Sequence, residues 1–435
     1  LKEMVNWAIN LEEQNNFQEM ERLILQFAFS EYCSQIKSGI PMSQMEFIRP
    51  QDLGLKNGLF NKIANNDFDD LIINGNSSED RVKLAHLLRD GFSSKNFGNL
   101  GIDETSMLIR EQYRKFVEED ISSQAHEWHL KDELIPLEII KQMAELGVFG
   151  LTIPESYGGL GMKKIAMCVV TEELSRGYIG IGSIGTRAEI AAELIKLGGT
   201  EEQKKKWLPK ISSGEILPTA VFSEPNTGSD LASLQTRADE DGDDYIINGV
   251  KTWNSGAIHS ELIWLAARTN HDVPKHKGVT VFLVELDSSG VTIDPIQNMA
   301  RIGGFSNITF DNVRVPKSNI VGELDQGWYV VAQNLDFERS GIERVASNYS
   351  IIHDFLEYIK TKKNNTRSSI NNSLVRNRIA DMFIEVEVGR YLAYNIAWMQ
   401  SKGLVPNKEA SISKVFGAET TKRNSQTMLE ILGMY

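Results

Sequence analysis

The chain has 435 residues, of which 41% are hydrophobic and 24% charged, and its formal net charge is -13. No apolar run approaches the roughly 18 residues that a transmembrane helix needs, so the composition predicts a soluble globular protein of several domains. The acidic balance disfavours nucleic acid or an anionic membrane surface as the main partner, because both attract basic patches.

Cysteine usage and the chain ends bear on the compartment. Cys33 and Cys168 stand far apart, which indicates neither a disulfide framework nor a thiolate metal cluster and fits a reducing compartment. No signal peptide is visible, and the sequence begins at Leu1 without a methionine. We expect a bacterial cytoplasmic location, and organelle targeting stays open.

The first part of the chain has helical texture. Apolar residues at helical spacing predict helices over residues 1–73, and the polar run NGNSSED (74–80) predicts a break. RVKLAHLLRDGF (81–92) predicts another short helix. We interpret residues 1–103 as a helical N-terminal extension.

The rest of the chain alternates in texture. Residues 104–216 are expected to be helical, and short β-rich runs separated by Gly, Asp and Asn predict a β domain over 217–327. Long helical patterns return over 328–435, a domain that we expect to be incomplete. The sequence therefore predicts an α+β fold with two helical domains around a β domain, preceded by the extension.

A glutamate interrupts an apolar stripe in the last domain. Steps of three and four residues from Leu335 to Ile359 predict one helix face, and every member of this stripe except Glu338 is apolar or aromatic. Burial raises the pKa of a carboxylate and makes it a stronger base. Glu338 is thus a candidate general base, and the alternative is a glutamate paired with a cation such as Arg339 or Arg344.

Several ordered motifs resemble the acyl-CoA dehydrogenase family. They are PESYGGLGM (154–162), EEQKKKWLPKISSGE (201–215), FSEPNTGSD (222–230), DYIINGVKTWNSGA (244–257) and VRVPKSNIVGELDQGW (313–328). The resemblance covers residues 104–435 and implies an acyl-CoA dehydrogenase-like fold. It also implies FAD between the β domain and the C-terminal helices, in a homodimer or homotetramer.

The resemblance implies a reaction as well. In this family a carboxylate removes the α-proton of an acyl-CoA thioester, and the β-hydrogen leaves as hydride to flavin N5. LDFER (335–339) is similar to the base-bearing stretch of branched-chain and long-chain members, which implies Glu338 as the catalytic base. In most other members the base lies in the last helical segment, past the position of Tyr435, and this alternative stays open.

Ligand contacts follow from the same motifs. The resemblance places FAD contacts on Phe222, Ser223, Gly228, Ser229, Trp253, Asn254 and Ser255, and substrate contacts on Ser229, Asp336 and Arg339. Glycine lets the backbone approach a ligand, and serine supplies hydrogen-bond donors. Each assignment has a simpler interpretation. NTGS is an ordinary β-turn, Trp253 is a core tryptophan followed by a loop serine, and Asp336 and Arg339 are surface charges.

The sequence departs from the family at several points. Relatives usually have Thr at Ser255 and often Asn at Gly256. The region after the first C-terminal helix lacks the Arg-x-x-Phe motif that often contacts FAD across a subunit interface. Arg367 or a lysine could substitute, so the pyrophosphate contacts and the assembly stay open.

Other candidate chemistry is weak. His126 and His129 lie three residues apart on a predicted helix with no third ligand nearby, which favours a surface pair over a metal site. We expect no metal.

The extension, the LDFER stretch and the missing motif are together most similar to a member that acts on (2S)-methylsuccinyl-CoA. This resemblance implies mesaconyl-CoA as the product and electron-transfer flavoprotein as the electron acceptor. The distal carboxylate of such a substrate needs a cation, and Arg187 and Arg301 are candidates. The alternatives are a branched-chain substrate such as isovaleryl-CoA, an acyl chain on a carrier protein, oxygen as acceptor, or a non-catalytic scaffold with the same fold.

Overall fold

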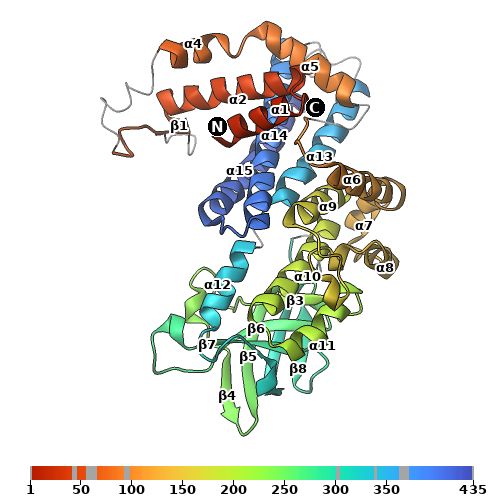
Figure 1. Cartoon of the computed structure of the whole chain (residues 1–435), viewed down its shortest axis with the longest axis vertical. Helices are drawn as coiled ribbons and strands as arrows, with labels where there is room; N and C mark the ends of the chain where they lie inside the picture. Colours follow the sequence, from red (N-terminus) through yellow and green to blue (C-terminus); the bar gives the residue numbers. More distant parts are fainter. Residues whose placement is uncertain are drawn as a thin grey trace. The chain divides into compact units, whose positions relative to one another are not determined.

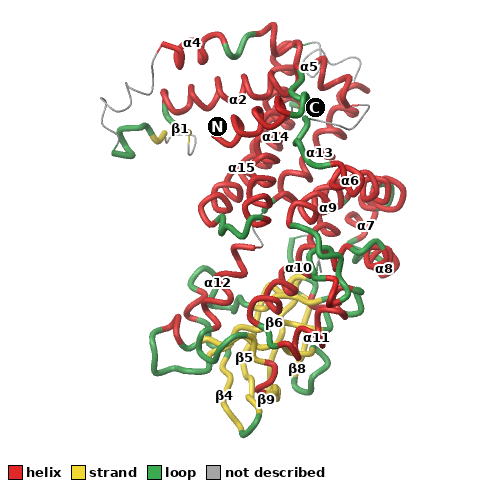
Figure 2. Tube along the Cα trace, viewed as in Figure 1, coloured by secondary structure: helices red, strands yellow, loops and turns green. Residues whose placement is uncertain are grey.

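The structure is a computed structural model that describes residues 2–41, 47–54, 66–92, 98–299, 304–337, 340–361 and 372–433. It contains two compact units, the first formed by residues 1–107, 344–395 and 411–435 and the second by 108–343 and 396–410. Helices dominate the first unit, and the second combines helices with a large sheet (Figures 1 and 2). The expected α+β class is confirmed.

The first unit is built almost entirely of helices. Its elements are α1 (Lys2–Glu13), α2 (Glu19–Ser38), the ribbon β1 (Ile40–Pro41) and β2 (Phe47–Ile48), α4 (Asn66–Asn74), α5 (Ser78–Phe92), and most of α13 (Ile342–Thr361), α14 (Ser373–Ser401) and α15 (Asn407–Leu432). The predicted break at 74–80 is shorter than expected, because α5 already begins at Ser78. The sequence did not predict the two-stranded ribbon.

The N-terminal extension shares one hydrophobic core with the C-terminal helices. Leu23 and Phe27 of α2 lie in the same buried cluster as Ile352 of α13 and Phe383 of α14. Since the same apolar surface is buried from both sides, the extension is an integral part of this unit.

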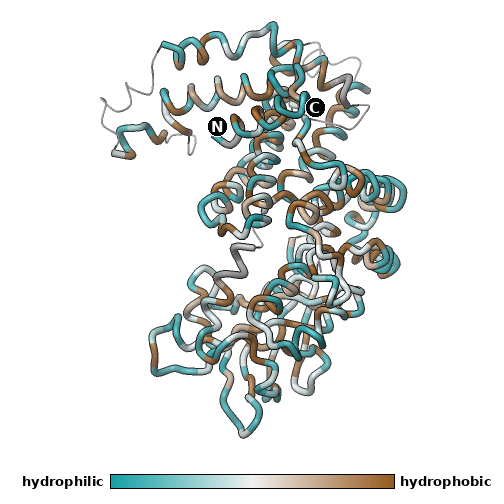
Figure 3. Tube along the Cα trace, in the orientation of Figure 1, coloured by the Kyte–Doolittle hydropathy of each residue, from teal (hydrophilic) through white to brown (hydrophobic). Residues whose placement is uncertain are grey.

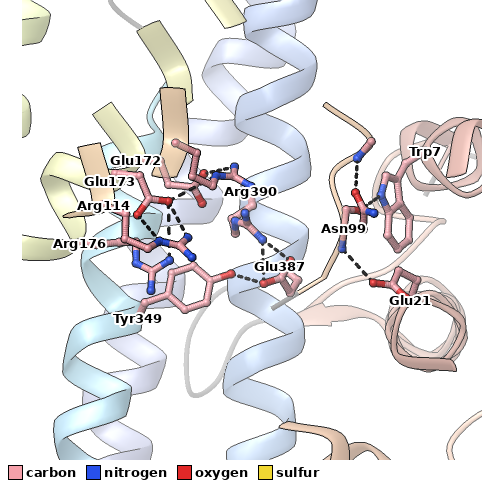
Figure 4. A network of polar contacts seen from close by, with 12 residues as sticks. Trp7, Glu21, Asn99, Arg114, Glu172, Glu173, Arg176, Tyr349, Glu387 and Arg390 are labelled. Atoms are coloured by element: carbon pink, nitrogen blue, oxygen red, sulfur yellow. Dashed lines mark hydrogen bonds and ion pairs between the residues drawn. The ribbon is translucent and has the colours of Figure 1, made fainter. Parts of the chain in front are cut away.

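Polar contacts tie the end of the extension to its first two helices. Trp7 Nε1 donates to the carbonyl oxygen of Asn99 at 2.7 Å, and the Asn99 N–H donates to Glu21 Oε1 at 2.9 Å (Figure 4). The Trp7 ring also lies 4.2 Å from the Tyr391 ring of α14, measured between centroids. These contacts hold the segment around Asn99 against α1 and α2, and they hold α1 against α14.

The predicted helix through Glu338 is wrong as a continuous element. α12 is described over Gly327–Phe337, and Glu338 itself lies outside the described residues. Gly341 has φ 71° and α13 begins at Ile342, so the stripe is not one continuous helix. A left-handed glycine is a common helix terminator because it lacks the Cβ that would clash there. The later part of the stripe is correct, since its members on α13 from Ile342 to Ile359 are buried.

The second unit contains the sheet and the helices that cover it. Its helices are most of α6 (Glu104–Phe116), then α7 (Ala125–Lys131), α8 (Leu137–Glu145), α9 (Lys164–Gly177), α10 (Ile179–Gly198), α11 (Glu201–Ser212) and α12. Its strands are β3 (Pro218–Val221), β4 (Arg237–Asp241), β5 (Asp244–Ser255), β6 (Leu262–Arg268), β7 (Val279–Glu285), β8 (Val291–Pro295), β9 (Phe305–Pro316) and β10 (Ile320–Val321).

The eight strands form one sheet with the order β10-β7-β6-β4-β5-β9-β8, and β3 pairs in parallel with β6. β6 is buried along its whole length. Leu262, Trp264 and Ala266 belong to the core shared with the helices, whereas Ile263 and Leu265 belong to the core of the β domain itself. Alternate residues of a strand point to opposite faces, which explains how one strand contributes to both cores. Hydrophobic and hydrophilic segments are mixed along the chain of this unit (Figure 3).

Helices α10 and α12 place the sheet against the helical part of this unit. α10 contacts β3, and α12 contacts β6 and β7. Two buried glutamates of α9 bind partly buried arginines of α6. Arg114 binds both carboxylate oxygens of Glu173 at 2.9 and 3.0 Å (Figure 4). Arg110 binds Glu172 at 2.9 Å. Such bidentate, desolvated pairs define the register between two helices.

Two simpler expectations can be compared with the structure. Cys33 and Cys168 are buried and form no disulfide, as expected. Within the described ranges, no helix combines the length and the apolar character required to cross a membrane.

Candidate active site

The end of β5 presents an unusual tryptophan. Trp253 has φ 60°, and 56% of it is exposed. It lies where the pairing of β5 with β9 is irregular, between Lys251 and Asn254. A left-handed backbone at a bulky residue costs about 1–3 kcal/mol and concentrates at functional sites, and a bulge re-aims side chains. The indole is therefore held outward at an energetic cost, in edge contact with Phe305 at 6.0 Å.

The loop after β3 lies beside this tryptophan. The Thr252 N–H donates to the carbonyl oxygen of Ser223 at 2.8 Å, so the two sequence motifs that contain these residues are neighbours in space. Phe222 packs edge-on against Trp264 at 4.6 Å between ring centroids. Further along the loop, Gly228 and Ser229 are exposed, and a Cβ at Gly228 would meet nothing within 4 Å.

Asn254 and Ser255 brace the strand end. Asn254 is buried, and its Nδ2 donates to the carbonyl oxygen of Ser306 at 3.0 Å. Its side chain therefore stabilises the pairing of β5 with β9. The carbonyl oxygen of Ser255 accepts from Thr219 Oγ1 at 2.9 Å. The predicted cofactor residues thus fall on one loop and one strand end of the second unit.

A buried ion pair joins that loop to that strand. Lys251 is completely buried, and its Nζ donates to Glu224 Oε1 at 2.9 Å and to the carbonyl oxygen of Phe222 at 3.0 Å. Burial lowers the pKa of Lys251 to about 8. Burial acts to raise the pKa of Glu224, but the Lys251 ammonium and the hydrogen bonds to the carboxylate outweigh it and lower that pKa. At neutral pH the pair is an ammonium and a carboxylate.

Glu224 and Lys251 were not predicted as functional residues, although both lie in the motifs FSEPNTGSD and DYIINGVKTWNSGA. A signal was present: in β5 the inward positions run Tyr245, Ile247, Gly249 and Lys251. A lysine at the inward position of such an alternation needs a buried partner. Its identity could not be found from the sequence, because Glu224 is distant in the chain.

A cavity of about 330 Å³ opens beside the end of β5. Its lining residues are His129, Asp132, Glu133, Leu134, Ile135, Ile140, Tyr178, Gly180, Ile184, Arg187, Leu217, Pro218, Gly256, His259, Ser260, Asn298, Gly304 and Phe305. The walls are therefore largely apolar, with a few charged and polar groups, which is the usual composition of a small-molecule site.

Arg187 and Gly256 meet in this cavity. A Cβ on Gly256 would lie 2.5 Å from Arg187 Nη1, so glycine leaves the room that the guanidinium occupies. Arg187 Nη2 also donates to Ser183 Oγ, one turn earlier on α10, at 3.1 Å. Nearby, the Nε2 atom of His259 is buried without a hydrogen-bond partner in the described structure.

The other predicted residues have varied fates. Asp336 lies on α12, but its side chain is not described, and Glu338, Arg339, Arg301 and Arg367 lie outside the described residues. Their predicted roles stay predictions.

The histidine pair of α7 is exposed. His126 and His129 both face solvent, and the described part of the chain holds no group of three or more potential metal ligands. His129 also lines the cavity, which the sequence did not predict.

The residues present fit a flavin. An outward-held indole offers an edge for a flat heteroaromatic ring, and the open loop around Gly228 gives a ligand access to the backbone. The structure holds both features together through Thr252 and Lys251.

Comparisons with known proteins identify one family from residue 103 to residue 435. Three family models match in succession: the acyl-CoA dehydrogenase N-terminal domain at residues 103–215, the middle domain at 219–313 and the C-terminal domain at 325–435. The matches span the greater part of the chain.

Individual relatives are similar to different extents. A (2S)-methylsuccinyl-CoA dehydrogenase of Cereibacter sphaeroides is 43% identical, with 100% of this chain and 81% of that protein covered. A mitochondrial isovaleryl-CoA dehydrogenase of Pongo abelii is 29% identical, with 73% and 77% covered. A solved structure of a glutaryl-coenzyme A dehydrogenase in complex with glutaryl-CoA is 28% identical, with 78% and 87% covered and a TM-score of 0.73.

Proposed function

Because the chain belongs to the acyl-CoA dehydrogenase family, we propose that it oxidises (2S)-methylsuccinyl-CoA to mesaconyl-CoA with FAD as cofactor. The family is one of flavoproteins, and the chain is an oxidoreductase that acts on an acyl-CoA thioester.

The observation that carries the choice of acyl group is Arg187 in the cavity. A guanidinium in a cavity that also has apolar walls favours a substrate with a carboxylate at its far end, because a guanidinium can bind both oxygens of that group. The hydrocarbon end of isovaleryl-CoA offers no such acceptor. The similarity to the Cereibacter sphaeroides relative supports the same choice.

The cavity also contains groups that oppose an anion. Asp132 and Glu133 line it together with Arg187, and a carboxylate close to them would be repelled. The proposed position of the distal carboxylate is therefore next to Arg187 and Gly256, with the apolar walls left for the methyl branch.

We propose that FAD is held by the loop at Phe222–Ser223, the open segment Gly228–Ser229 and the strand end from Trp253 to Ser255. When bound, the flavin supplies an acceptor for the β-hydrogen as hydride. The protein orients the thioester, keeps water out of the cavity and removes the α-proton. Ser229 is also a proposed substrate contact, as are Asp336 and Arg339.

Glu338 is the proposed base. Its place in LDFER supports this assignment. A carboxylate with little water around it gains basicity, and each pKa unit is worth about 1.4 kcal/mol of driving force.

The function is tested by anaerobic visible spectra of the wild type and Glu338→Gln, before and after adding methylsuccinyl-CoA or isovaleryl-CoA. We expect a yellow wild type that bleaches with methylsuccinyl-CoA and a yellow Glu338→Gln that does not. Bleaching of both proteins would place the base elsewhere. A wild type without flavin would contradict the cofactor assignment, and bleaching by isovaleryl-CoA alone would select the branched-chain alternative.

Arg187 is tested separately. Arg187→Met keeps the apolar stem and removes the charge, so the rate with methylsuccinyl-CoA should fall while that with isovaleryl-CoA holds or rises. Truncating a group that binds a desolvated carboxylate typically costs 2–5 kcal/mol, or about 30-fold or more in kcat/KM. Equal losses with both thioesters would show that Arg187 is structural.

We further propose electron-transfer flavoprotein as the electron acceptor and a homodimer or homotetramer as the assembly. Reduction of purified electron-transfer flavoprotein by the substrate-reduced protein checks the first. Light scattering of the holoprotein checks the second.

A further inference from the structure

The loop that precedes Glu224 is tied to β5 at three successive residues. The carbonyl oxygen of Phe222 accepts from Lys251 Nζ, the carbonyl oxygen of Ser223 accepts from the Thr252 N–H, and the carboxylate of Glu224 accepts from Lys251 Nζ again. Two of these three bonds come from one ammonium group. Lys251 therefore sets the conformation of the loop as well as its distance from the strand.

Glu224 extends the connection to the next segment of the chain. Its Oε2 accepts from the Gln235 N–H at 2.6 Å and its Oε1 from the Thr236 N–H at 2.9 Å. Within the loop, Glu224 and Thr227 exchange two backbone hydrogen bonds of 2.9 and 3.0 Å. The carboxylate is thus the junction of the loop, the ammonium of β5 and the segment that leads into β4.

The pair is costly, which indicates a purpose beyond stability. Two buried charges gain little net stability over well-packed apolar residues, because desolvation offsets their attraction. Here the same charges hold the backbone of Ser223 on one side and the strand that leads into Trp253 on the other. Trp253 is the residue with the left-handed backbone, only two positions after Lys251.

We propose that Glu224 and Lys251 are a positioning pair that holds the flavin-binding loop in register with Trp253 and Ser255. This inference rests on the proposed flavin site. Glu224 and Lys251 do not touch the reacting atoms. They act through the backbone of residues 222–224 and 252–253, and so control how tightly and in what environment the flavin is bound.

The test compares apoprotein and holoprotein of three variants. Lys251→Met and Glu224→Gln each remove one charge, and the double variant Glu224→Gln with Lys251→Met leaves no unpaired charge. The control is Lys164→Met, which breaks a partly buried ion-pair cluster between α9 and α10 of the same unit, with Glu189 at 2.7 Å and Glu193 at 2.9 Å. Folding is followed by circular dichroism, FAD affinity by quenching of flavin fluorescence, and the flavin environment by its reduction potential.

We expect the double variant to fold and to bind FAD about tenfold or more weakly, with a shifted flavin reduction potential, as when an outer supporting partner is lost. Lys164→Met should lower the melting temperature and leave FAD affinity within about twofold. Lys251→Arg keeps the charge and should recover part of the affinity.

Several results would overturn the inference. One is a folded double variant that binds FAD with wild-type affinity and potential. Another is a loss of affinity in Lys164→Met equal to that in the double variant, which would reduce the pair to general stability. If the single variants fail to fold, the double variant and Lys251→Arg still decide. A wild type that binds no FAD at all would instead overturn the proposed function, so the two failures are distinguishable.

Discussion

Arg187 Nη1 lies 2.5 Å from the point where a Cβ on Gly256 would stand, so the guanidinium fills the space that a larger residue at position 256 would need. The two residues come from α10 and from the turn after β5, and both line the same cavity. This relationship gives a structural reason for a glycine at position 256.

Gly256→Ala should displace the guanidinium and impair the oxidation of a dicarboxylic thioester. A displacement of about 1 Å in a positioning group can lower the rate by up to about a hundredfold, and we expect kcat/KM for methylsuccinyl-CoA to fall by at least about tenfold. Steady-state kinetics with methylsuccinyl-CoA and isovaleryl-CoA check this.

The matched control is Gly242→Ala. Gly242 has φ 64°, close to the φ 69° of Gly256, but a Cβ there meets nothing within 4 Å. The control carries the same backbone strain without the contact. If both variants lost activity to the same extent, strain alone would explain the loss, and the guanidinium would not be involved.

Trp253 should lower the stability of the apoprotein and increase the affinity for FAD. Its backbone is left-handed and its side chain mostly exposed, so Trp253→Gly relieves strain that Trp253→Ala retains. The difference in free energy of unfolding between the two apoproteins should be about 1 kcal/mol in favour of glycine. FAD titration should show the same loss of affinity in both, because both lack the indole. Denaturant unfolding of equal stability in the two variants would argue against the strain.

The shared core predicts that a change in the extension is felt in the C-terminal helices. Phe27→Ala on α2 should cost about 3–5 kcal/mol, because Phe27 is almost fully buried in the cluster that includes Ile352 and Phe383. Hydrogen exchange in α13 and α14 should become faster.

The control for this prediction is Ile9→Ala on α1, an apolar residue that is half exposed. It should change the stability by no more than about 0.5 kcal/mol. Unchanged protection of α13 and α14 in Phe27→Ala would mean that the extension packs without supporting them.

Two carboxylates of the first unit should contribute to the pH dependence of folding stability with opposite signs. Burial raises the pKa of Glu385, and the Arg423 guanidinium offsets only part of this effect. The folded chain therefore binds more protons than the unfolded chain above the ordinary carboxylate pKa, and stability falls as pH rises through that window. Glu385→Gln should remove this fall. The melting temperature of the variant, relative to that of the wild type, should therefore increase as the pH rises from about 4.5 to 7.

Glu430→Gln is the counterpart of opposite sign. The hydrogen bond from Arg378 lowers the pKa of Glu430, so its contribution to stability is present above the ordinary carboxylate pKa and is lost as pH falls. As the pH rises, the melting temperature of the variant should decrease relative to that of the wild type. The decrease should be small because the ion pair is exposed. Parallel shifts in both variants would contradict the assignment.

Local patterns in the sequence determined much of the architecture. The helical texture of the extension, the change to short β-rich runs at Pro218 and the return of helices at Trp328 were all readable, because periodicity and turn chemistry are properties of neighbouring residues. The motifs around Ser223 and Trp253 indicated the family for the same reason, and the family models agree.

Only the tertiary structure decided how these pieces meet. The stripe through Glu338 was predicted as one helix because its spacing is regular, yet Gly341 lies in a left-handed conformation before α13. The partner of Lys251, the contact of Arg187 with Gly256 and the core shared by α2 and α14 join residues far apart in the chain. Such contacts leave no periodic signal, since they depend on the path of the chain between them. The contacts of Lys251 and Arg187 form part of the candidate site.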